Sequence, residues 1–66
     1  MPLHEQLTAI LREQIRSGEL AGRLPSGKTL AQQYEVSHRT SERALATLRD
    51  EGLVVAVIGK GYYVAR

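Results

Sequence analysis

The sequence contains no cysteine, which excludes disulfide bridges and metal sites built on thiolates. Aromatic side chains are scarce as well, since the chain has three tyrosines and neither phenylalanine nor tryptophan. The core must therefore be built from leucine, valine, isoleucine and alanine, which favours close helix packing over a large ligand cavity. No apolar run reaches the length of about 18 residues that a membrane span needs.

The start of the chain also lacks the order of a secretory signal peptide, in which basic residues precede an apolar segment. With neither a signal nor a span, the cytoplasm is the expected location. The chain has 66 residues, enough for one domain, because a chain this short buries only about 60% of its unfolded surface. The net charge of +2 is too small to indicate a nucleic-acid partner. The positive excess does, however, lie in the middle of the chain, over residues 23–49.

Residues 3–17 have the spacing of an amphipathic helix. Charged side chains lie elsewhere on the helical wheel. Apolar side chains recur every three or four residues, at Leu3, Leu7, Ile10, Leu11 and Ile15. Pro2 suits the first helical turn and Gly18 the end of the helix. Residues 18–25 then predict a loop, from which Leu20 and Leu24 fold back onto the core.

Two serines mark the starts of two further helices. Ser26 is suited to cap a short helix over residues 27–34, and Ser37 is suited to cap a third helix after a tight turn at residues 35–37. Tyr34 fills the core under this pair of helices. The third helix runs from about His38 to Glu51 and buries one stripe of the wheel, made of Ser41, Ala44, Leu45 and Leu48.

The periodicity changes after Gly52, which ends the third helix in the left-handed conformation and lets Leu53 pack back against it. Residues 53–58 are rich in β-branched side chains, residues 59–61 predict a turn, and residues 62–65 predict a second strand. Tyr62 and Tyr63 alternate across that strand, so one faces the core and the other faces solvent or a phosphate. The predicted fold class is α+β and mostly helical, with three helices and a C-terminal two-stranded β-hairpin.

The second and third predicted helices, joined by a short turn, match a helix-turn-helix. In that arrangement the second helix enters the DNA major groove, which is about 12 Å wide and accepts one helix. Opposite its buried stripe the third helix carries Arg39 and Arg43, with His38, Thr40 and Glu42 near its start. Two interpretations of the arginines stay open: they are merely solvated, or they contact a duplex.

The Gly-Lys-Gly tip of the hairpin favours the second interpretation. A small, flexible and cationic turn suits a wing that follows a phosphate backbone or enters a minor groove. The alternative, an ordinary solvent turn with an incidental lysine, fits less well directly after a helix-turn-helix. We therefore expect a winged helix-turn-helix.

The chain closely resembles the winged helix-turn-helix domain of GntR-type bacterial transcription regulators, through the string LPSGKTLAQQYEVSHRTSERALATLRDEGLVVAVIGKGYYV. With the first helix and residues 18–20, the resemblance covers nearly the whole chain. The matching pieces are specific in their order and spacing: Leu24-Pro25-Ser26, Leu30-Ala31, Val36-Ser37, Thr40, Ala44-Leu45, Leu48, Glu51-Gly52-Leu53, Gly59-Lys60-Gly61 and Val64. The resemblance implies one DNA-binding domain over residues 1–66.

The resemblance also implies roles for single residues. Lys28 corresponds to an arginine that touches DNA, and His38 to an arginine that reads a base edge. Ser37 and Thr40 match hydroxyls that contact phosphate, and the Gly-Lys-Gly turn matches the wing tip. With the outer face of the third helix, the expected DNA-binding residues are Lys28, Ser37, His38, Arg39, Thr40, Glu42, Arg43, Gly59, Lys60 and Gly61. No catalytic residue, cofactor or metal ligand is predicted.

Departures from the usual family pattern fall at the start of the second helix and in the turn. Gly27 and Thr29 stand where glutamates are usual, so the capping box of Ser26 is incomplete and the second helix is expected to fray at its start. Glu35 lies where the turn often uses glycine, because the left-handed conformation is costly for other residues.

Further departures lie on the third helix, where Ser41 replaces an aliphatic residue. The usual order of arginine and glutamate is also inverted at Glu42 and Arg43. We therefore hypothesise that Arg39 and Arg43 share the base readout, while Glu42 orients them or accepts a hydrogen bond from a cytosine amino group.

For the complete regulator, the resemblance implies a metabolite-responsive protein, most often a repressor, with a larger effector-binding and dimerising domain after this one. Its homodimer would bind an inverted-repeat operator. The domain alone is expected to be a monomer that binds DNA weakly, in the range of about 10⁻⁴–10⁻⁶ M. The competing function is a protein-interaction module, but winged helices of that kind usually lose the basic helix face and the cationic tip that this sequence has.

Overall fold

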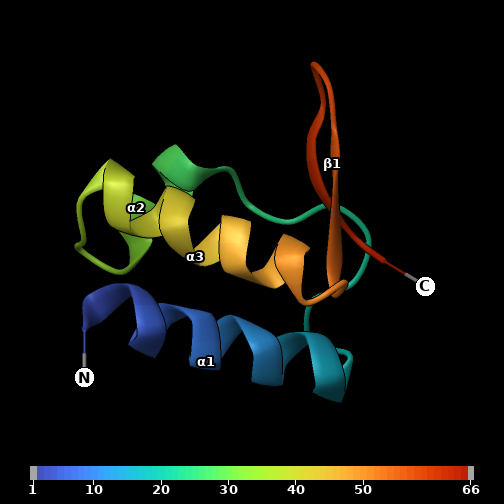
Figure 1. Ribbon diagram of the computed structural model, residues 1–66, viewed down its shortest axis with the longest axis horizontal. Coiled ribbons are helices and arrows are strands. Elements are labelled where there is room, and N and C mark those ends of the chain that lie inside the picture. The colour runs from blue at the N-terminus through green and yellow to red at the C-terminus, as the bar shows by residue number, and fades with distance from the viewer. Residues whose placement is uncertain (1, 66) are drawn as a thin grey trace.

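The computed structural model describes residues 2–65 and consists of three helices and a hairpin that stands away from them (Figure 1). The helices are α1 (Leu3–Ser17), α2 (Gly27–Gln33) and α3 (His38–Asp50), and the strands are β1 (Val54–Val57) and β2 (Gly61–Val64). The predicted order and the α+β class are therefore confirmed. Within the described part of the chain, no helix is long and apolar enough to cross a bilayer.

α1 lies alongside α3, as Figure 1 shows, and buries Leu7 and Leu11 against it. Thr8 is buried beside them because its hydroxyl finds a partner in its own helix, donating to the carbonyl oxygen of His4 at 2.6 Å. Leu3 and Ile10 share the predicted apolar spacing, yet they remain 58% and 43% exposed. They project from one margin of the stripe, beyond the reach of α3.

α3 is the central element, since it packs on α1, α2 and β1. The predicted stripe of Ser41, Ala44, Leu45 and Leu48 is buried along its whole length. Leu24 and Leu30 are buried in the same core, and Leu20 and Tyr34 pack against it as predicted.

The ends of the helices follow the local sequence closely. Gly52 has φ +79°, its N–H bonds to the Arg49 carbonyl at 2.9 Å, and the Leu53 N–H bonds to the Leu48 carbonyl at 3.0 Å. These two bonds form the glycine cap expected after α3. The first helix has its predicted bounds, whereas the second and third predicted helices are each one residue too long, because α2 ends at Gln33 and α3 at Asp50.

The turn between α2 and α3 bends at Glu35, whose φ of +55° lies in the left-handed region. A non-glycine residue pays roughly 1–2 kcal/mol there. The prediction that Glu35 takes a conformation usually left to glycine is confirmed.

The two strands pair antiparallel, with Val54 opposite Val64 and Val57 opposite Gly61. Gly61 is therefore the first residue of β2 and not part of the turn, which covers residues 58–60. Compared with the predicted strands over 53–58 and 62–65, β1 is one residue shorter at each end, and β2 begins and ends one residue earlier. Tyr62 packs against the core, so Tyr63, on the opposite face of β2, is the tyrosine directed away from it.

The loop after α1 adds a third extended segment to the hairpin. The Leu24 N–H donates to the Tyr62 carbonyl at 2.8 Å, and the Val64 N–H donates to the Gly22 carbonyl at 2.8 Å. Between these two bonds Arg23 forms an antiparallel bridge with Tyr63. β2 is therefore held on both edges, which fixes the direction in which the hairpin projects.

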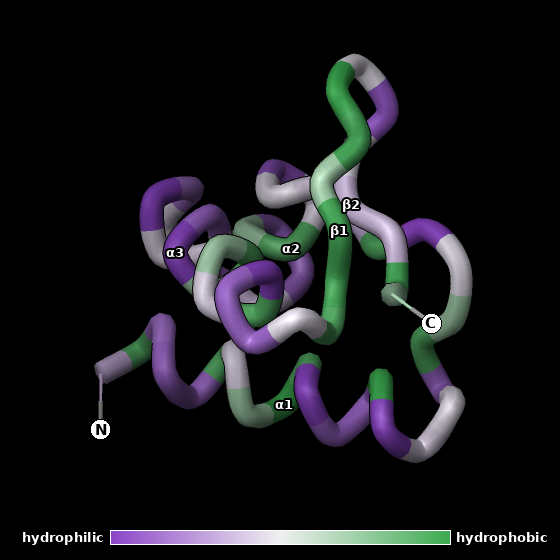
Figure 2. The backbone as a smooth tube through the Cα atoms, turned by 45° about the vertical axis from the view of Figure 1, so that its right-hand side comes forward, coloured by the Kyte–Doolittle hydropathy of each residue, from purple (hydrophilic) through white to green (hydrophobic). Residues whose placement is uncertain are grey.

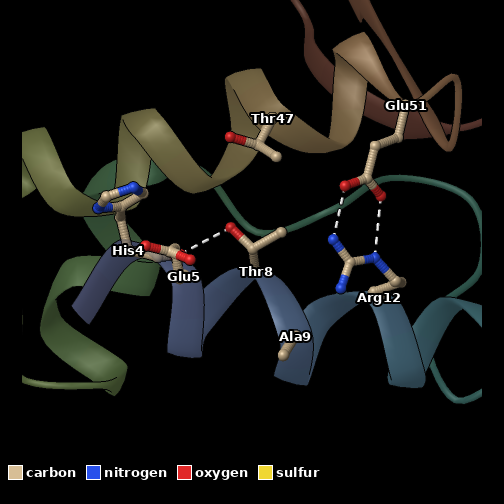
Figure 3. Close-up of a pocket in the computed structure, with 7 residues that line it drawn as sticks. All are labelled: His4, Glu5, Thr8, Ala9, Arg12, Thr47 and Glu51. Carbon is tan, nitrogen blue, oxygen red and sulfur yellow. Dashed lines mark hydrogen bonds and ion pairs between the residues drawn. The ribbon is translucent and has the colours of Figure 1, made fainter. Parts of the chain in front are cut away.

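One ion pair ties α1 to the end of α3 (Figure 3). The guanidinium of Arg12 donates to the two carboxylate oxygens of Glu51, at 2.9 Å from Nε and 2.5 Å from Nη2. These hydrogen bonds hold the pKa of Glu51 below its ordinary value. The pair lies in a hollow between the two helices whose other lining residues are His4, Glu5, Thr8, Ala9 and Thr47.

Candidate nucleic-acid interface

Both helices of the helix-turn-helix begin with the same local device. The Oγ of Ser26 accepts from the N–H of Thr29 at 3.1 Å, and the Oγ of Ser37 accepts from the N–H of Thr40 at 3.0 Å. Each serine hydroxyl in turn donates to the threonine hydroxyl, at 3.0 Å in α2 and 2.9 Å in α3. α2 is therefore capped at its start, and Thr29 supplies a partner for Ser26 in place of the usual glutamate.

This geometry separates the roles of Ser37 and Thr40. The proton of the Ser37 hydroxyl is used within the cap, because it is donated to Thr40. The Thr40 hydroxyl accepts that bond and keeps its own proton for an outside acceptor such as a phosphate oxygen. Thr29 has the same free donor at the start of α2 and is exposed. In the sequence alone, Thr29 stands out only as a departure from the family pattern.

The outer face of α3 is cationic and open. Arg39 and Arg43 are both exposed, and neither forms an ion pair with any acidic side chain in residues 2–65. The half-buried Ala46 follows on this face one turn along the helix and adds little bulk. Two guanidinium groups are thus free to meet an anionic ligand, and this is the arrangement that the sequence predicted.

Glu42 is held back against the start of α2. Its Oε2 lies 3.4 Å from Nε2 of His38, one turn earlier on α3. Any side chain at position 27 would clash with the Glu42 carboxylate, because a Cβ built on Gly27 would lie only 1.8 Å from the same Oε2. Glycine at this position therefore makes room for the carboxylate. In the described residues the Glu42 carboxylate lies beside the His38 imidazole and forms no ion pair with Arg39 or Arg43.

Ser41 and Gly27, two departures from the family pattern, are in direct contact. The buried Ser41 hydroxyl lies 2.7 Å from the carbonyl oxygen of Gly27 and 2.8 Å from that of His38. This contact joins the first residue of α2 to the first turn of α3. Lys28, the next residue of α2, is exposed and is carried to the same end of the surface.

The wing supplies a second group of site residues. Lys60 is exposed in the turn, whose ends are joined by a hydrogen bond of 3.0 Å from the Lys60 N–H to the Val57 carbonyl. Gly59 and Gly61, on either side, have φ of +77° and +108°. The hairpin rises beside the C-terminal end of α3 (Figure 1), whereas His38 lies at the other end of that helix. The site therefore consists of two separate cationic regions.

Arg23 is a residue of this surface that sequence reasoning missed. Its bridge with Tyr63 places it beside β2, and its Nε and Nη2 lie 3.7 and 3.8 Å from the position of a Cβ on Gly61. It is exposed, has no ion-pair partner among residues 2–65, and lines hollows on both sides, one with the wing and one with the start of α2. No local pattern marks this residue, because its place depends on a pairing 40 positions away in the chain.

Three helices with a cationic third helix and a projecting hairpin define a winged helix-turn-helix. The sequence pattern of the family described as "Bacterial regulatory proteins, gntR family" matches residues 3–64. The chain belongs to this family.

Relatives with known roles are transcription regulators. The chain is 35% identical to the HTH-type transcriptional repressor NagR of Bacillus subtilis, over all of this chain and 28% of that protein. It is 39% identical to the histidine utilization repressor of Klebsiella aerogenes, over 97% of this chain and 27% of that protein. The chain thus spans about a quarter of the length of these two repressors.

A solved structure with the same fold contains DNA. The DNA-binding domain of AraR in complex with its operator ORX1 superimposes with a TM-score of 0.92 and 30% identity, over 98% of this chain and 81% of that chain. The predicted winged helix-turn-helix fold is therefore confirmed.

Proposed function

We propose that this domain binds double-stranded DNA through the outer face of α3 and the tip of the wing. The observation that carries the proposal is the pair of exposed, unpaired arginines, Arg39 and Arg43, on the side of α3 opposite its buried stripe. A helix of this kind fits the major groove, where arginine is the commonest reader of guanine. The DNA-binding domain of AraR, which has the same fold, is in complex with its operator, and this supports DNA binding by the present domain.

The remaining site residues divide into base contacts and phosphate contacts. His38, at the start of α3, is placed to reach a base edge. The Glu42 carboxylate beside it can accept from a cytosine amino group once its side chain turns away from Gly27. Lys28 and Thr40 have free donors for phosphates at the same end of the helix. Ser37 acts mainly as the cap that orients Thr40. Lys60, between Gly59 and Gly61, binds phosphate at the wing.

For the complete regulator we infer a repressor that responds to a metabolite and acts as a homodimer on an inverted-repeat operator. The two repressors of known role among its relatives, each several times longer than this chain, support that inference. The effector-binding and dimerising functions belong to a further domain, and this domain has no catalytic role. A regulator that binds the bacterial chromosome works in the cytoplasm.

A titration of labelled mixed-sequence duplex at two salt concentrations tests DNA binding itself. Each phosphate contact adds about 0.9 to the slope of log affinity against log salt. With three to five contacts from the exposed cations, binding should weaken roughly a hundredfold between about 50 and 200 mM salt. An absence of binding at the lower salt concentration would refute the proposal and favour a protein-interaction module.

A further inference from the structure

Ile58 is fully exposed at the tip of the wing and has no role in the fold. Its exposed fraction is 101%, so its side chain contacts nothing else in the domain. In the turn closed by the Lys60 N–H and the Val57 carbonyl, Ile58 takes the second position and Gly59, with φ +77°, the third. A side chain at this corner projects outward from the end of the hairpin.

The apolar character continues from the tip down β1. Val55 and Val57 are 46% and 38% exposed, on the face of β1 opposite the buried Val54. Figure 2 shows hydrophobic colour along β1 to the end of the hairpin, well beyond the helices, with a hydrophilic segment directly after the tip. Burial within the domain therefore does not account for this apolar surface.

Two cations border the apolar tip. A hollow at the wing is lined by Ile58, Val57, Ala56 and Tyr62, together with Lys60 and Arg23 and the two glycines of the turn. All of its lining residues lie in the described chain and none is acidic. An apolar projection flanked by positive charge is complementary to a DNA minor groove, whose sugars and base edges lie between two rows of phosphates.

We propose that Ile58 enters the minor groove as an apolar wedge and partly opens one base step, while Lys60 and Arg23 bind the flanking phosphates. Isoleucine is among the side chains that DNA-bending proteins insert between base pairs. The step under the wing is then a flexible pyrimidine–purine step, because such steps unstack most easily. This inference rests on the DNA binding proposed above, and it adds deformation of the duplex.

Two measurements on the 66-residue chain distinguish the insertion of Ile58 between base pairs from DNA binding as such. The experiment starts from the duplex sequence that in vitro selection against the chain yields. A series of duplexes is then made from it, and each carries a TA step at a different position flanking the selected site. Fluorescence anisotropy measures affinity, and permanganate oxidation detects thymines that are no longer stacked. The bound wild-type chain should raise the reactivity of thymine at one flanking step severalfold over the free duplex.

Substitutions at the tip then assign the effect to the side chain. Ile58→Ser should return thymine reactivity to the level of the free duplex and weaken binding by about tenfold at most, because one apolar contact is lost. Ile58→Leu should keep the reactivity. Leu3→Ser, which changes another exposed apolar residue at the start of α1 and in neither strand of the wing, should alter neither readout.

Three results would overturn the inference. Tight binding of the wild-type chain with no reactive thymine would mean that the duplex is not opened, while DNA binding itself would stand. Reactivity that survives in Ile58→Ser would assign the opening to another residue. In sedimentation without DNA, a dimer of the wild-type chain that Ile58→Ser converts to a monomer would mean that the tip contacts a second copy.

Discussion

Replacing Ser41 by alanine tests the contact that joins the two helices of the helix-turn-helix. The hydroxyl is fully buried and lies within 2.8 Å of two carbonyl oxygens, those of Gly27 and His38. The hydroxyl has a single proton, so removing the hydroxyl removes the equivalent of one buried hydrogen bond. The free energy of unfolding should fall by about 0.5–1.5 kcal/mol. A domain of this size rarely has more than about 3–5 kcal/mol of stability, so the loss is readily measured.

Urea denaturation followed by circular dichroism gives the free energy of unfolding, and a thermal scan should show a melting temperature lower by about 4–8 °C for each kcal/mol lost. Ser17→Ala is the matched control, because the Ser17 hydroxyl donates to the Gln14 carbonyl at 3.2 Å on the exposed end of α1. That control should change stability by less than about 0.5 kcal/mol. A Ser41→Ala variant as stable as the wild type would refute the reasoning, since the buried hydroxyl would then contribute nothing.

The remaining predictions concern charge. Lys60→Ala should weaken binding equally on all duplex sequences and lower the salt slope by about 0.9, and unchanged binding would mean that the wing does not touch DNA. Arg23→Ala should do the same, whereas Arg16→Ala on α1 should leave the slope unchanged. Glu51 has a lowered pKa through its hydrogen bonds from Arg12, so its stabilising effect is complete above the unfolded-state pKa of about 4.3 and is lost as the pH falls through the lower folded value. The stability difference between the wild type and Glu51→Gln should accordingly vanish in acid, and a difference that persists at the lowest pH would contradict the assignment.

Local patterns in the sequence were sufficient for most of the fold. The buried stripe of α3 follows from helical spacing, and the two serine caps and the left-handed Gly52 follow from residue type at helix ends. The exposure of Arg39 and Arg43 could be predicted for the same reason, since the side of the wheel opposite a buried stripe faces outward.

Features that depend on contacts between distant segments could not be predicted. Arg23 reaches the wing only through its pairing with β2, and Gly61 is drawn into the strand by its position opposite Val57. The Glu42 carboxylate lies over Gly27 because two helices approach there, which neither helix reveals by itself. Leu3 is the opposite case: its spacing in the sequence predicts burial, but in the described residues no helix or strand covers it and it stays exposed.

Binding of the Arg39→Ala variant to two duplexes tests the central claim most directly. Fluorescence anisotropy would compare the sequence selected in vitro against the wild-type chain with a mixed-sequence duplex at the same salt concentration. If Arg39 reads a base in the major groove, the substitution should cost about 1–3 kcal/mol on the selected duplex and much less on the mixed one. An equal loss on both would reduce Arg39 to a phosphate contact, and no loss on either would contradict the assignment of α3 as the reading helix.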